Sequence, residues 1–283
     1  MLSEEKMTEV RAAFREDSHY LGHCSAQVRA VLTEIIDHPW FPGVTDPSAL
    51  GLLGSLLRII QPERMLQLGT HIGFSAIYFA DILMRNARPG TLVTVEPDEL
   101  AHEAARQWAV KAGVEPAIQF VDGRSVDEQV DSALRASGPF DLVYLDSSHS
   151  YAGTKDELAL ILRPGGWLGE HGILLLHDVT ELLANLSPEF EGGVRRAVLE
   201  WLALHPSDYH HLLLEPPLWP NGCGLGAISR RTAHIERQNG DHSIRPHQLR
   251  QNGWRQNGRP QHGQTFGWLA RLKHDMRRLV RTG

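Results

Sequence analysis

The residues best suited to chemistry stand where two apolar runs end. The run FDLVYL is followed by Asp146, and His149 comes three residues later in the stretch DSSH. A second run, GILLL, is followed by His177 and Asp178. Carboxylates and imidazoles are ligands for hard or borderline divalent cations. A histidine with a pKa of about 6.5 can also take up a proton at neutral pH, although His149 could instead be a helix cap or a polar loop residue.

These residues need a scaffold, and the middle of the chain predicts one. Short apolar runs alternate with amphipathic stretches, a rhythm typical of a parallel sheet covered by helices on both faces. The last two runs are joined by too few residues for a crossover helix, so we expect them to pair antiparallel. The prediction is an α/β, Rossmann-like, doubly wound sheet of seven strands with the last strand antiparallel. The expected strands are 64–68, 91–95, 117–121, 140–145, 172–176, 209–215 and 224–229, and the expected helices between them are about 74–86, 98–112, 125–136, 151–162 and 189–204.

The predicted sheet brings the two reactive stretches together. In open α/β sheets the ligand lies at the carboxyl ends of the strands, near the point where the strand order reverses. Asp146 follows the fourth predicted strand, and His177 and Asp178 follow the fifth. We therefore expect these three side chains to converge and to form a metal site.

A glycine-containing loop follows the first predicted strand in the stretch MLQLGTHIGFSA. Its spacing, Gly69-x-x-x-Gly73, differs from the G-x-G-x-x-G pattern of dinucleotide-binding proteins. Glycine at a strand end lets the backbone approach a ligand closely. Glu96 follows the second strand, where its carboxylate can accept hydrogen bonds from both hydroxyls of a ribose. The third strand ends in VDGRS, residues 121–125, beside the expected position of an adenine.

With these motifs, residues 43–229 resemble a class I S-adenosylmethionine-dependent methyltransferase. They are most similar to metal-dependent small-molecule O-methyltransferases of the catechol type and to the macrolide-sugar O-methyltransferase and cephalosporin-hydroxylase-like group. The family usually has Glu or Asp at the position of Gln67, where the carboxylate helps to hold the methionine ammonium, so the resemblance implies weaker binding here. The segment FPGVTDPS, residues 41–48, resembles the loop that covers the methionine end. The cofactor-binding residues that the resemblance and the loop positions imply are Gln67, Gly69, Thr70, Gly73, Ser75, Glu96, Gly123, Arg124, Ser125 and Asp146.

The resemblance also assigns roles to the reactive stretches. The related enzymes bind Mg²⁺ through an Asp after the fourth strand and an acidic or amide pair after the fifth, which Asp146 and Asp178 match. His177 departs from the usual Asp or Glu, so Mn²⁺, Fe²⁺ or Zn²⁺ become candidates beside Mg²⁺. The stretch DSSH is similar to the D-x-x-H of sugar O-methyltransferases, in which the histidine is the general base. This implies that His149 is catalytic.

Three functions remain open from the sequence. The first is a metal-assisted O-methyltransferase that acts on a hydroxyl group of a sugar, a polyketide or another natural product. The second is an enzyme of the same fold with different chemistry, as in the cephalosporin-hydroxylase-like group. The third is an S-adenosylmethionine-binding module without catalysis, which the substitutions at Gln67 and His177 keep open.

Composition divides the chain into four parts. We expect a helical cap over 1–48, with helices at about 4–16 and 22–37, and the methyltransferase domain over 49–230. Residues 231–264 repeat a polar, Gly-containing phrase that predicts a disordered linker. Residues 265–283 predict a basic amphipathic helix, which could pack on its own domain, on a partner or weakly on a membrane surface.

Charge and cysteine content narrow the expected partners. Residues 231–283 hold 11 Lys and Arg against 3 Asp and Glu, whereas the rest of the chain holds 17 against 31. An acidic main domain argues against nucleic-acid binding. Two cysteines in unrelated contexts indicate no disulfide framework or zinc motif, and no apolar run is long enough to span a membrane. We expect a cytoplasmic protein, and the helical cap favours a homo-oligomer.

Overall fold

A computed structural model describes residues 4–41, 44–181, 191–215 and 223–231. They belong to one compact unit, Met1–Ala233. The predicted terminal helix and all but the first residue of the predicted linker lie outside the described residues. Among the described residues, none of the helices has the length and apolar character to cross a membrane.

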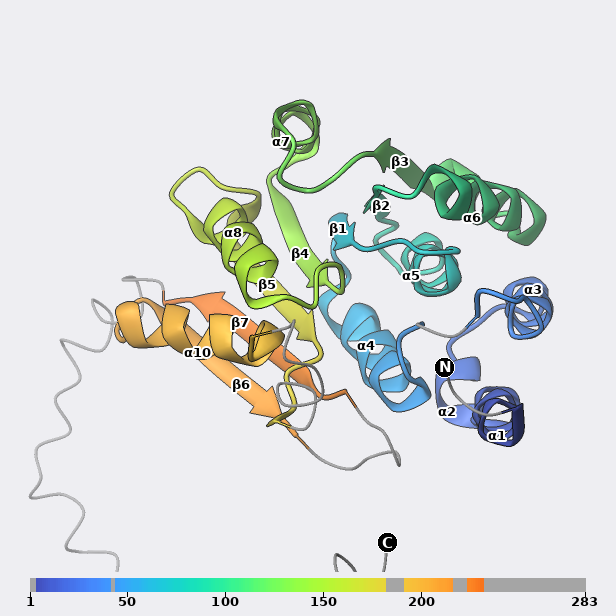
Figure 1. Ribbon diagram of the computed structural model, residues 1–283. Helices are drawn as coiled ribbons and strands as arrows, with labels where there is room; N and C mark the ends of the chain where they lie inside the picture. Colours follow the sequence, from blue (N-terminus) through green and yellow to red (C-terminus); the bar gives the residue numbers. More distant parts are fainter. Residues whose placement is uncertain (1–3, 42–43, 182–190, 216–222, 232–283) are drawn as a thin grey trace, which may run out of the picture. The chain divides into compact units, whose positions relative to one another are not determined.

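The centre of the unit is a sheet of seven strands in the order β3-β2-β1-β4-β5-β7-β6. Strands β1 to β5 pair in parallel, and β7 lies antiparallel between β5 and β6 (Figure 1). The predicted architecture is therefore confirmed, including the antiparallel last strand. The strands are β1 (Arg64–Leu68), β2 (Thr91–Glu96), β3 (Ile118–Asp122), β4 (Phe140–Leu145), β5 (Leu168–His177), β6 (Tyr209–Leu214) and β7 (Leu225–Arg230).

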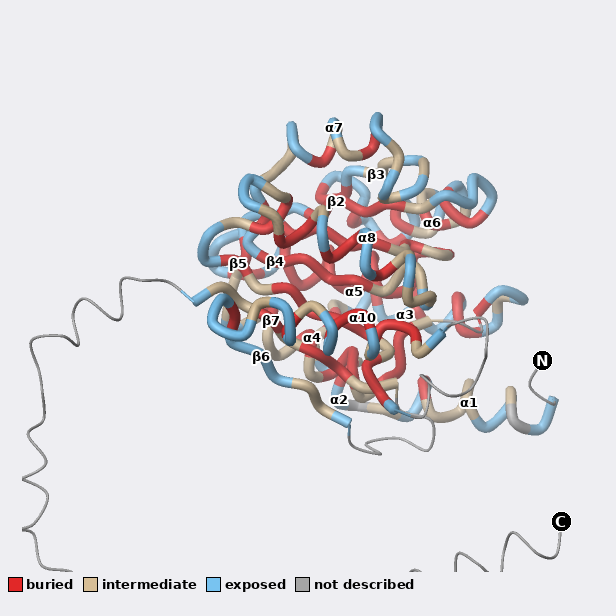
Figure 2. The backbone as a smooth tube through the Cα atoms, turned by 60° about the vertical axis from the view of Figure 1, so that its left-hand side comes forward, coloured by how far each residue is buried: buried red, intermediate tan, exposed pale blue. Residues whose placement is uncertain are grey.

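Helices cover both faces of the sheet, as near-continuous apolar strands require. Successive strand residues face opposite sides, so Met65 belongs to the apolar cluster under α4, α5 and α6, and Leu66 to the cluster under α7, α8 and α10. Figure 2 shows this buried centre between exposed outer helix surfaces. The longer helices are α1 (Glu4–Glu16), α3 (Ala26–Ile35), α4 (Pro47–Ile60), α5 (Phe74–Met84), α6 (Glu99–Ala112), α7 (Glu128–Ser137), α8 (Tyr151–Leu162) and α10 (Gly193–Leu204), with the short helices α2 (Ser18–Leu21) and η1 (Glu115–Ala117).

Helix α4 is the main element that the sequence pattern did not predict. Its glycines, Gly51 and Gly54, are poor helix formers, although its buried residues Leu50, Leu53, Gly54 and Leu57 follow the helical spacing. Both glycines lie against other helices, because a Cβ at Gly51 would overlap His19 and one at Gly54 would overlap Tyr78. Close helix packing, which is not readable from one sequence, therefore sets the composition of α4.

The N-terminal helices share a core with the domain. The ring of Phe14 in α1 packs edge-on against Phe41 and Phe74, with centroids 4.9 and 5.6 Å apart. Phe74 is the first residue of α5, directly after the glycine loop. The N-terminal helices therefore support the loop at the sheet edge.

Candidate active site

A cavity of about 410 Å³ opens at the carboxyl ends of β1, β2 and β4, beside the loop that follows β3. This volume is typical of a pocket for one small ligand. The strand order places it where β1 separates β2 and β3 from β4 and β5, the switch point at which open α/β sheets bind ligands. Its lining residues are Val44, Thr45, Leu68, Gly69, Thr70, His71, Phe74, Ser75, Val95, Glu96, Pro97, Arg124, Ser125, Val126, Asp146, Ser147, Ser148, His149, Gly153 and Glu157.

The glycine loop forms one wall of this cavity. Gly69 has φ 92°, in the left-handed region, and a Cβ there would overlap the carbonyl oxygen of Asp146. Only glycine satisfies both conditions. The loops after β1 and β4 are thereby in direct backbone contact at the bottom of the cavity.

Most predicted cofactor residues line the cavity, but three do not. Gly69, Thr70, Ser75, Glu96, Arg124, Ser125 and Asp146 are lining residues, whereas Gln67, Gly73 and Gly123 are not. Gln67 is fully buried, and its Nε2 donates to the carbonyl of Gly69 and to Ser75 Oγ, both at 2.8 Å. Its position in the structure is that of a brace for the glycine loop.

Glu96 joins the ends of β1 and β2. Its Oε2 accepts a hydrogen bond from the backbone N–H of His71 at 2.7 Å, and its Oε1 accepts one from Asp98 N–H at 3.1 Å. A carboxylate can accept further bonds at both oxygens. Glu96 is therefore placed to receive ligand hydroxyls while it fixes the glycine loop.

A second buried acid, Glu157 of α8, was not singled out by the sequence. Ser125 Oγ and Ser147 Oγ both donate to its Oε1 at 2.6 Å. Its Oε2 is buried without a hydrogen-bond partner among the described residues. Burial raises the pKa of Glu157, because the two hydroxyl donors only partly replace the lost water. Its position within an ordinary helical pattern gave no signal, since only the fold reveals the burial.

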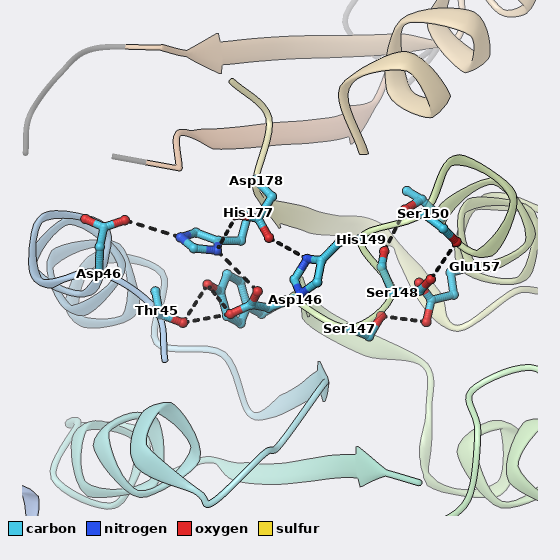
Figure 3. Close-up of polar contacts among 12 residues, drawn as sticks. Thr45, Asp46, Asp146, Ser147, Ser148, His149, Ser150, Glu157, His177 and Asp178 are labelled. Atoms are coloured by element: carbon cyan, nitrogen blue, oxygen red, sulfur yellow. Dashed lines mark hydrogen bonds and ion pairs between the residues drawn. The ribbon is translucent and has the colours of Figure 1, made fainter. Parts of the chain in front are cut away.

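The ends of β4 and β5 carry the cluster that the sequence predicted to converge. His177 Nδ1 lies 3.2 Å from Asp146 Oδ1 and 3.3 Å from Asp178 Oδ1 (Figure 3). His149 Nδ1 lies 2.6 Å from Asp178 Oδ2. Asp178 has φ 59°, a left-handed conformation that is uncommon outside glycine and that clusters at functional sites.

Opposite charges dominate this cluster. Burial disfavours a charge on His177, but Tyr144 and the carboxylates of Asp146 and Asp178 outweigh burial and raise its pKa well above the usual value. The hydrogen bond to Asp178 raises the pKa of His149 against the opposing effect of burial. The carboxylates therefore stabilise positive charge at the edge of the cavity.

The segment before α4 closes the cluster from the N-terminal side. Asp46 caps α4 by accepting from the backbone N–H groups of Ser48 and Ala49, and its Oδ2 lies 3.3 Å from His177 Nε2. Thr45 Oγ1 donates to Asp146 Oδ2 at 2.8 Å. The D-P-S sequence is a typical helix start, a signal that could have located both residues.

Two groups of side chains in the described residues have metal-ligand spacing. Asp146, His149 and Asp178 form one group, and Asp46, His177 and Cys223 form the other, with the ligand atoms of each group within 4.8 Å of one another. The predicted set of Asp146, His177 and Asp178 is thus close together but divided between the groups. Asp146 and His149 also line the cavity.

The sheet order, the antiparallel strand and the cavity at the switch point are those of the class I methyltransferase fold. Residues 66–179 match a family described as a methyltransferase domain. Together these features are consistent with a class I S-adenosylmethionine-dependent methyltransferase.

Catechol and rhamnosyl O-methyltransferases are among the curated relatives. Catechol O-methyltransferase B of Danio rerio is 34% identical over 152 residues, 50% of this chain and 53% of that protein. Rhamnosyl O-methyltransferase of Mycobacterium tuberculosis (strain ATCC 25618 / H37Rv) is 29% identical over 160 residues, 55% of this chain and 62% of that protein. The chain matches roughly half the length of these relatives.

Solved structures give the same fold. An O-methyltransferase from Bacillus cereus in complex with S-adenosylhomocysteine (SAH) has a TM-score of 0.61 at 18% identity, covering 80% of this chain and 100% of that one. TomG from Streptomyces achromogenes, in complex with S-adenosylmethionine (SAM), has a TM-score of 0.59 at 21% identity, covering 82% and 100%.

Proposed function

We propose that this protein is a SAM-dependent O-methyltransferase that transfers a methyl group to a hydroxyl of a small molecule, with a divalent cation assisting. The observation that carries the proposal is the sharing of Asp146 and His149 between the ligand cavity and the charged cluster. A cofactor in the cavity would then lie beside groups that can hold a cation and accept a proton. The catechol and rhamnosyl relatives support a sugar or another natural product as the acceptor.

The cavity residues fit the parts of the cofactor. Glu96 would accept the ribose hydroxyls, because its carboxylate lies in the wall at the end of β2. The glycine loop and Ser75 would hold the methionine end, with Thr45 also in the cavity lining. Gln67 would act through the loop that it braces, since it does not line the cavity.

The charged cluster fits a divalent cation. Ligand atoms bound at about 2.1 Å and at right angles around an octahedral ion are about 3 Å apart. The separations of His177 Nδ1 from Asp146 Oδ1 and Asp178 Oδ1, 3.2 and 3.3 Å, are close to this value. Asp146 and Asp178 would hold the cation with one histidine, and mixed oxygen and nitrogen donors admit Mn²⁺, Fe²⁺ or Zn²⁺ beside Mg²⁺. When bound, the cation would lower the pKa of the acceptor hydroxyl and orient it.

His149 would accept the proton of that hydroxyl. With Nδ1 directed to Asp178, the neutral imidazole carries its acceptor lone pair on Nε2. The acceptor oxygen forms a bond to the methyl carbon while the carbon–sulfur bond breaks, and the sulfur keeps the electron pair in SAH. The proton passes to His149, and the carboxylate of Asp178 stabilises the resulting imidazolium.

Calorimetry and a product assay test the proposal. The protein should bind SAM and SAH, and mass spectrometry should detect a methylated product from a panel of sugar, catechol and polyketide hydroxyl compounds. Chelation should stop the transfer, and one of the four cations should restore it. Lack of SAM binding would refute the proposal. Binding without any product, or a different reaction on the same acceptors, would favour the non-catalytic module or the same-fold enzyme with other chemistry.

A further inference from the structure

Asp46 and Cys223 have no role in the proposed reaction, yet both lie close to the ring of His177. The carboxylate of Asp46, the imidazole of His177 and the thiol of Cys223 each place one ligand atom within 4.8 Å of the other two. Asp46 is 7% exposed and His177 is 4% exposed. Asp46 precedes α4, His177 ends β5 and Cys223 precedes β7. The fold therefore gathers three different metal-binding groups at one largely buried point.

The contact between Asp46 and His177 has the spacing of two ligands around one ion. Asp46 Oδ2 lies 3.3 Å from His177 Nε2, and Figure 3 shows the two side chains directed at each other. A direct hydrogen bond between an imidazolium and a carboxylate is usually about 2.7–2.9 Å long. Two atoms bound to zinc at about 2.0–2.1 Å and at the tetrahedral angle are about 3.3–3.4 Å apart. The observed separation therefore fits a metal ion between the two groups better than a proton.

Backbone contacts fix the positions of Asp46 and Cys223. Asp46 Oδ1 accepts from two backbone N–H groups at the start of α4, at 3.1 and 3.0 Å, so Oδ2 is the oxygen that faces His177. The carbonyl oxygen of Cys223 accepts from the backbone N–H of Thr180 at 3.2 Å. The next residue, Gly224, has φ 76°, and a Cβ there would lie 2.8 Å from Thr180 Cγ2. The segment before β7 is therefore packed tightly on the residues that follow His177.

The second nitrogen of His177 has the partner that a metal-bound histidine needs. Nδ1 lies 3.2 Å from Asp146 Oδ1 and 3.3 Å from Asp178 Oδ1. A histidine that binds a metal through one nitrogen usually donates its other N–H to a carboxylate or a carbonyl, which fixes the orientation of the ring. A neutral imidazole has one acceptor nitrogen, so a metal ion at Nε2 keeps the proton on Nδ1. His177 would then donate to Asp146 or Asp178 and leave both carboxylates to hold the cation of the proposed function.

We propose that Asp46 Oδ2, His177 Nε2 and Cys223 Sγ bind a Zn²⁺ ion, with a fourth position for water. Thiolate and imidazole ligands together favour zinc over Mg²⁺. The charges of the carboxylate and the thiolate balance that of the ion, and a neutral site is the form that burial favours. Sulfur and nitrogen ligands of tetrahedral zinc are about 3.5 Å apart, so the sulfur, which lies within 4.8 Å, has about 1.3 Å or less to close. Such a site goes beyond the proposed function, since it needs neither SAM nor an acceptor.

Cobalt substitution tests the ligands directly. The untagged full chain is freed of metals with a chelator and titrated with Co²⁺ in excess Mg²⁺, which prefers oxygen ligands. One equivalent of Co²⁺ should give the visible bands of tetrahedral cobalt and a sulfur-to-cobalt charge-transfer band, and Zn²⁺ should remove both by displacement. Binding of Co²⁺ or Zn²⁺ without a thiolate signal would place the ion at Asp146, His149 and Asp178 and overturn the inference.

Two variants each remove one ligand. Loss of a partner behind a metal ligand costs about 10- to 100-fold in affinity, so loss of the ligand itself should cost at least as much. Cys223→Ser should therefore lose the charge-transfer band and bind Zn²⁺ at least about 100-fold more weakly. Asp46→Asn should bind it at least about 10-fold more weakly, while the asparagine still caps α4. A folded Cys223→Ser with unchanged Zn²⁺ affinity would contradict the site.

The matched control is Cys24→Ser. Cys24 is the other cysteine of the chain, and its sulfur donates to the carbonyl of Tyr20, so this variant should keep the wild-type spectrum and Zn²⁺ affinity. Alkylation of the wild type, followed by peptide mass spectrometry, does not depend on the folding of any variant. Zn²⁺ should abolish the alkylation of Cys223 and leave that of Cys24 unchanged. Equal alkylation of Cys223 with and without Zn²⁺ would refute the site, whatever the methyl-transfer assay gives.

Discussion

The carboxylates at the two parts of one sheet edge have different hydrogen-bond partners. Near the ends of β2 and β3, backbone N–H groups donate to Glu96, and two serine hydroxyls donate to one oxygen of Glu157 in α8. At the ends of β4 and β5, imidazoles also lie against Asp146 and Asp178. A carboxylate with neutral donors can accept further hydrogen bonds from a neutral ligand. A carboxylate beside an imidazole can stabilise positive charge and take part in proton transfer. Under the proposed function, the first part binds the cofactor and the second takes part in the reaction.

The largest effect should come from Asp146, which belongs to both parts. Asp146→Asn removes a charge that contacts His177, Thr45 and Tyr144. We expect kcat to fall by about 100-fold or more, the scale of a lost electrostatic or acid–base contribution. The rate of product formation at saturating SAM measures this fall in kcat. The variant Asp156→Asn, at an exposed position, is the control. Full activity would show that the cluster takes no part in the reaction.

A variant of His149 should affect the reaction rate much more than the binding of SAH. His149→Gln removes the proposed base but keeps a polar side chain, so kcat should fall about 100-fold and SAH affinity should change by no more than about threefold, which is below 1 kcal/mol. Steady-state kinetics and calorimetry on the same sample give both numbers. His171→Gln, at an exposed position on β5, should behave like wild type. A loss of SAH binding equal to the loss of kcat would assign His149 to the binding part.

A variant of Gln67 tests how a new buried charge beside the glycine loop changes the stability of the protein. Gln67→Glu replaces two donated hydrogen bonds in a fully buried site with a carboxylate facing two oxygen atoms. We expect the free energy of unfolding to drop by about 2 kcal/mol. Urea denaturation measures the drop, with exposed Gln129→Glu as control. Unchanged stability, with both SAM and SAH bound more tightly than by wild type, would instead place this side chain at the amino-acid ammonium that the two ligands share.

The smallest effect should be a pH dependence at His102, which is fully buried. Burial lowers the pKa of His102, more than the hydrogen bond to Asp122 raises it. The unfolded chain therefore binds the proton more tightly, so this contribution to stability is complete above a pH of about 6.5 and is lost as the pH falls through the lower folded pKa. Between about pH 7.5 and 5, wild type should lose more stability in urea titrations than His102→Gln. Parallel curves would contradict this.

The sequence predicted the scaffold better than the pairings within the site. Buried parallel strands are near-continuous apolar runs, so β1 and β4 were located at their observed bounds. Strand order then brought Asp146 and Asp178 to one edge. The contact of Asp46 with His177 and the hydrogen bond from Ser125 to Glu157 join segments that are far apart in the chain. A single sequence does not contain that information.

Gln67 illustrates what a motif leaves open. The spacing of LQLGTHIG located the loop correctly, but the structure directs this side chain into the loop and outside the cavity lining. A side chain at a strand end can face a ligand or its own loop, and only packing decides between them.

The contact at Gly69 has a consequence for how such a protein can diversify. At this point the cavity wall is peptide backbone pressed against the carbonyl of Asp146, with no room for any side chain. A point substitution cannot reshape that wall without breaking it. Under the proposed function, changes of the accepted substrate would instead fall on other lining residues, such as Val44, Thr45 and Ser147–His149.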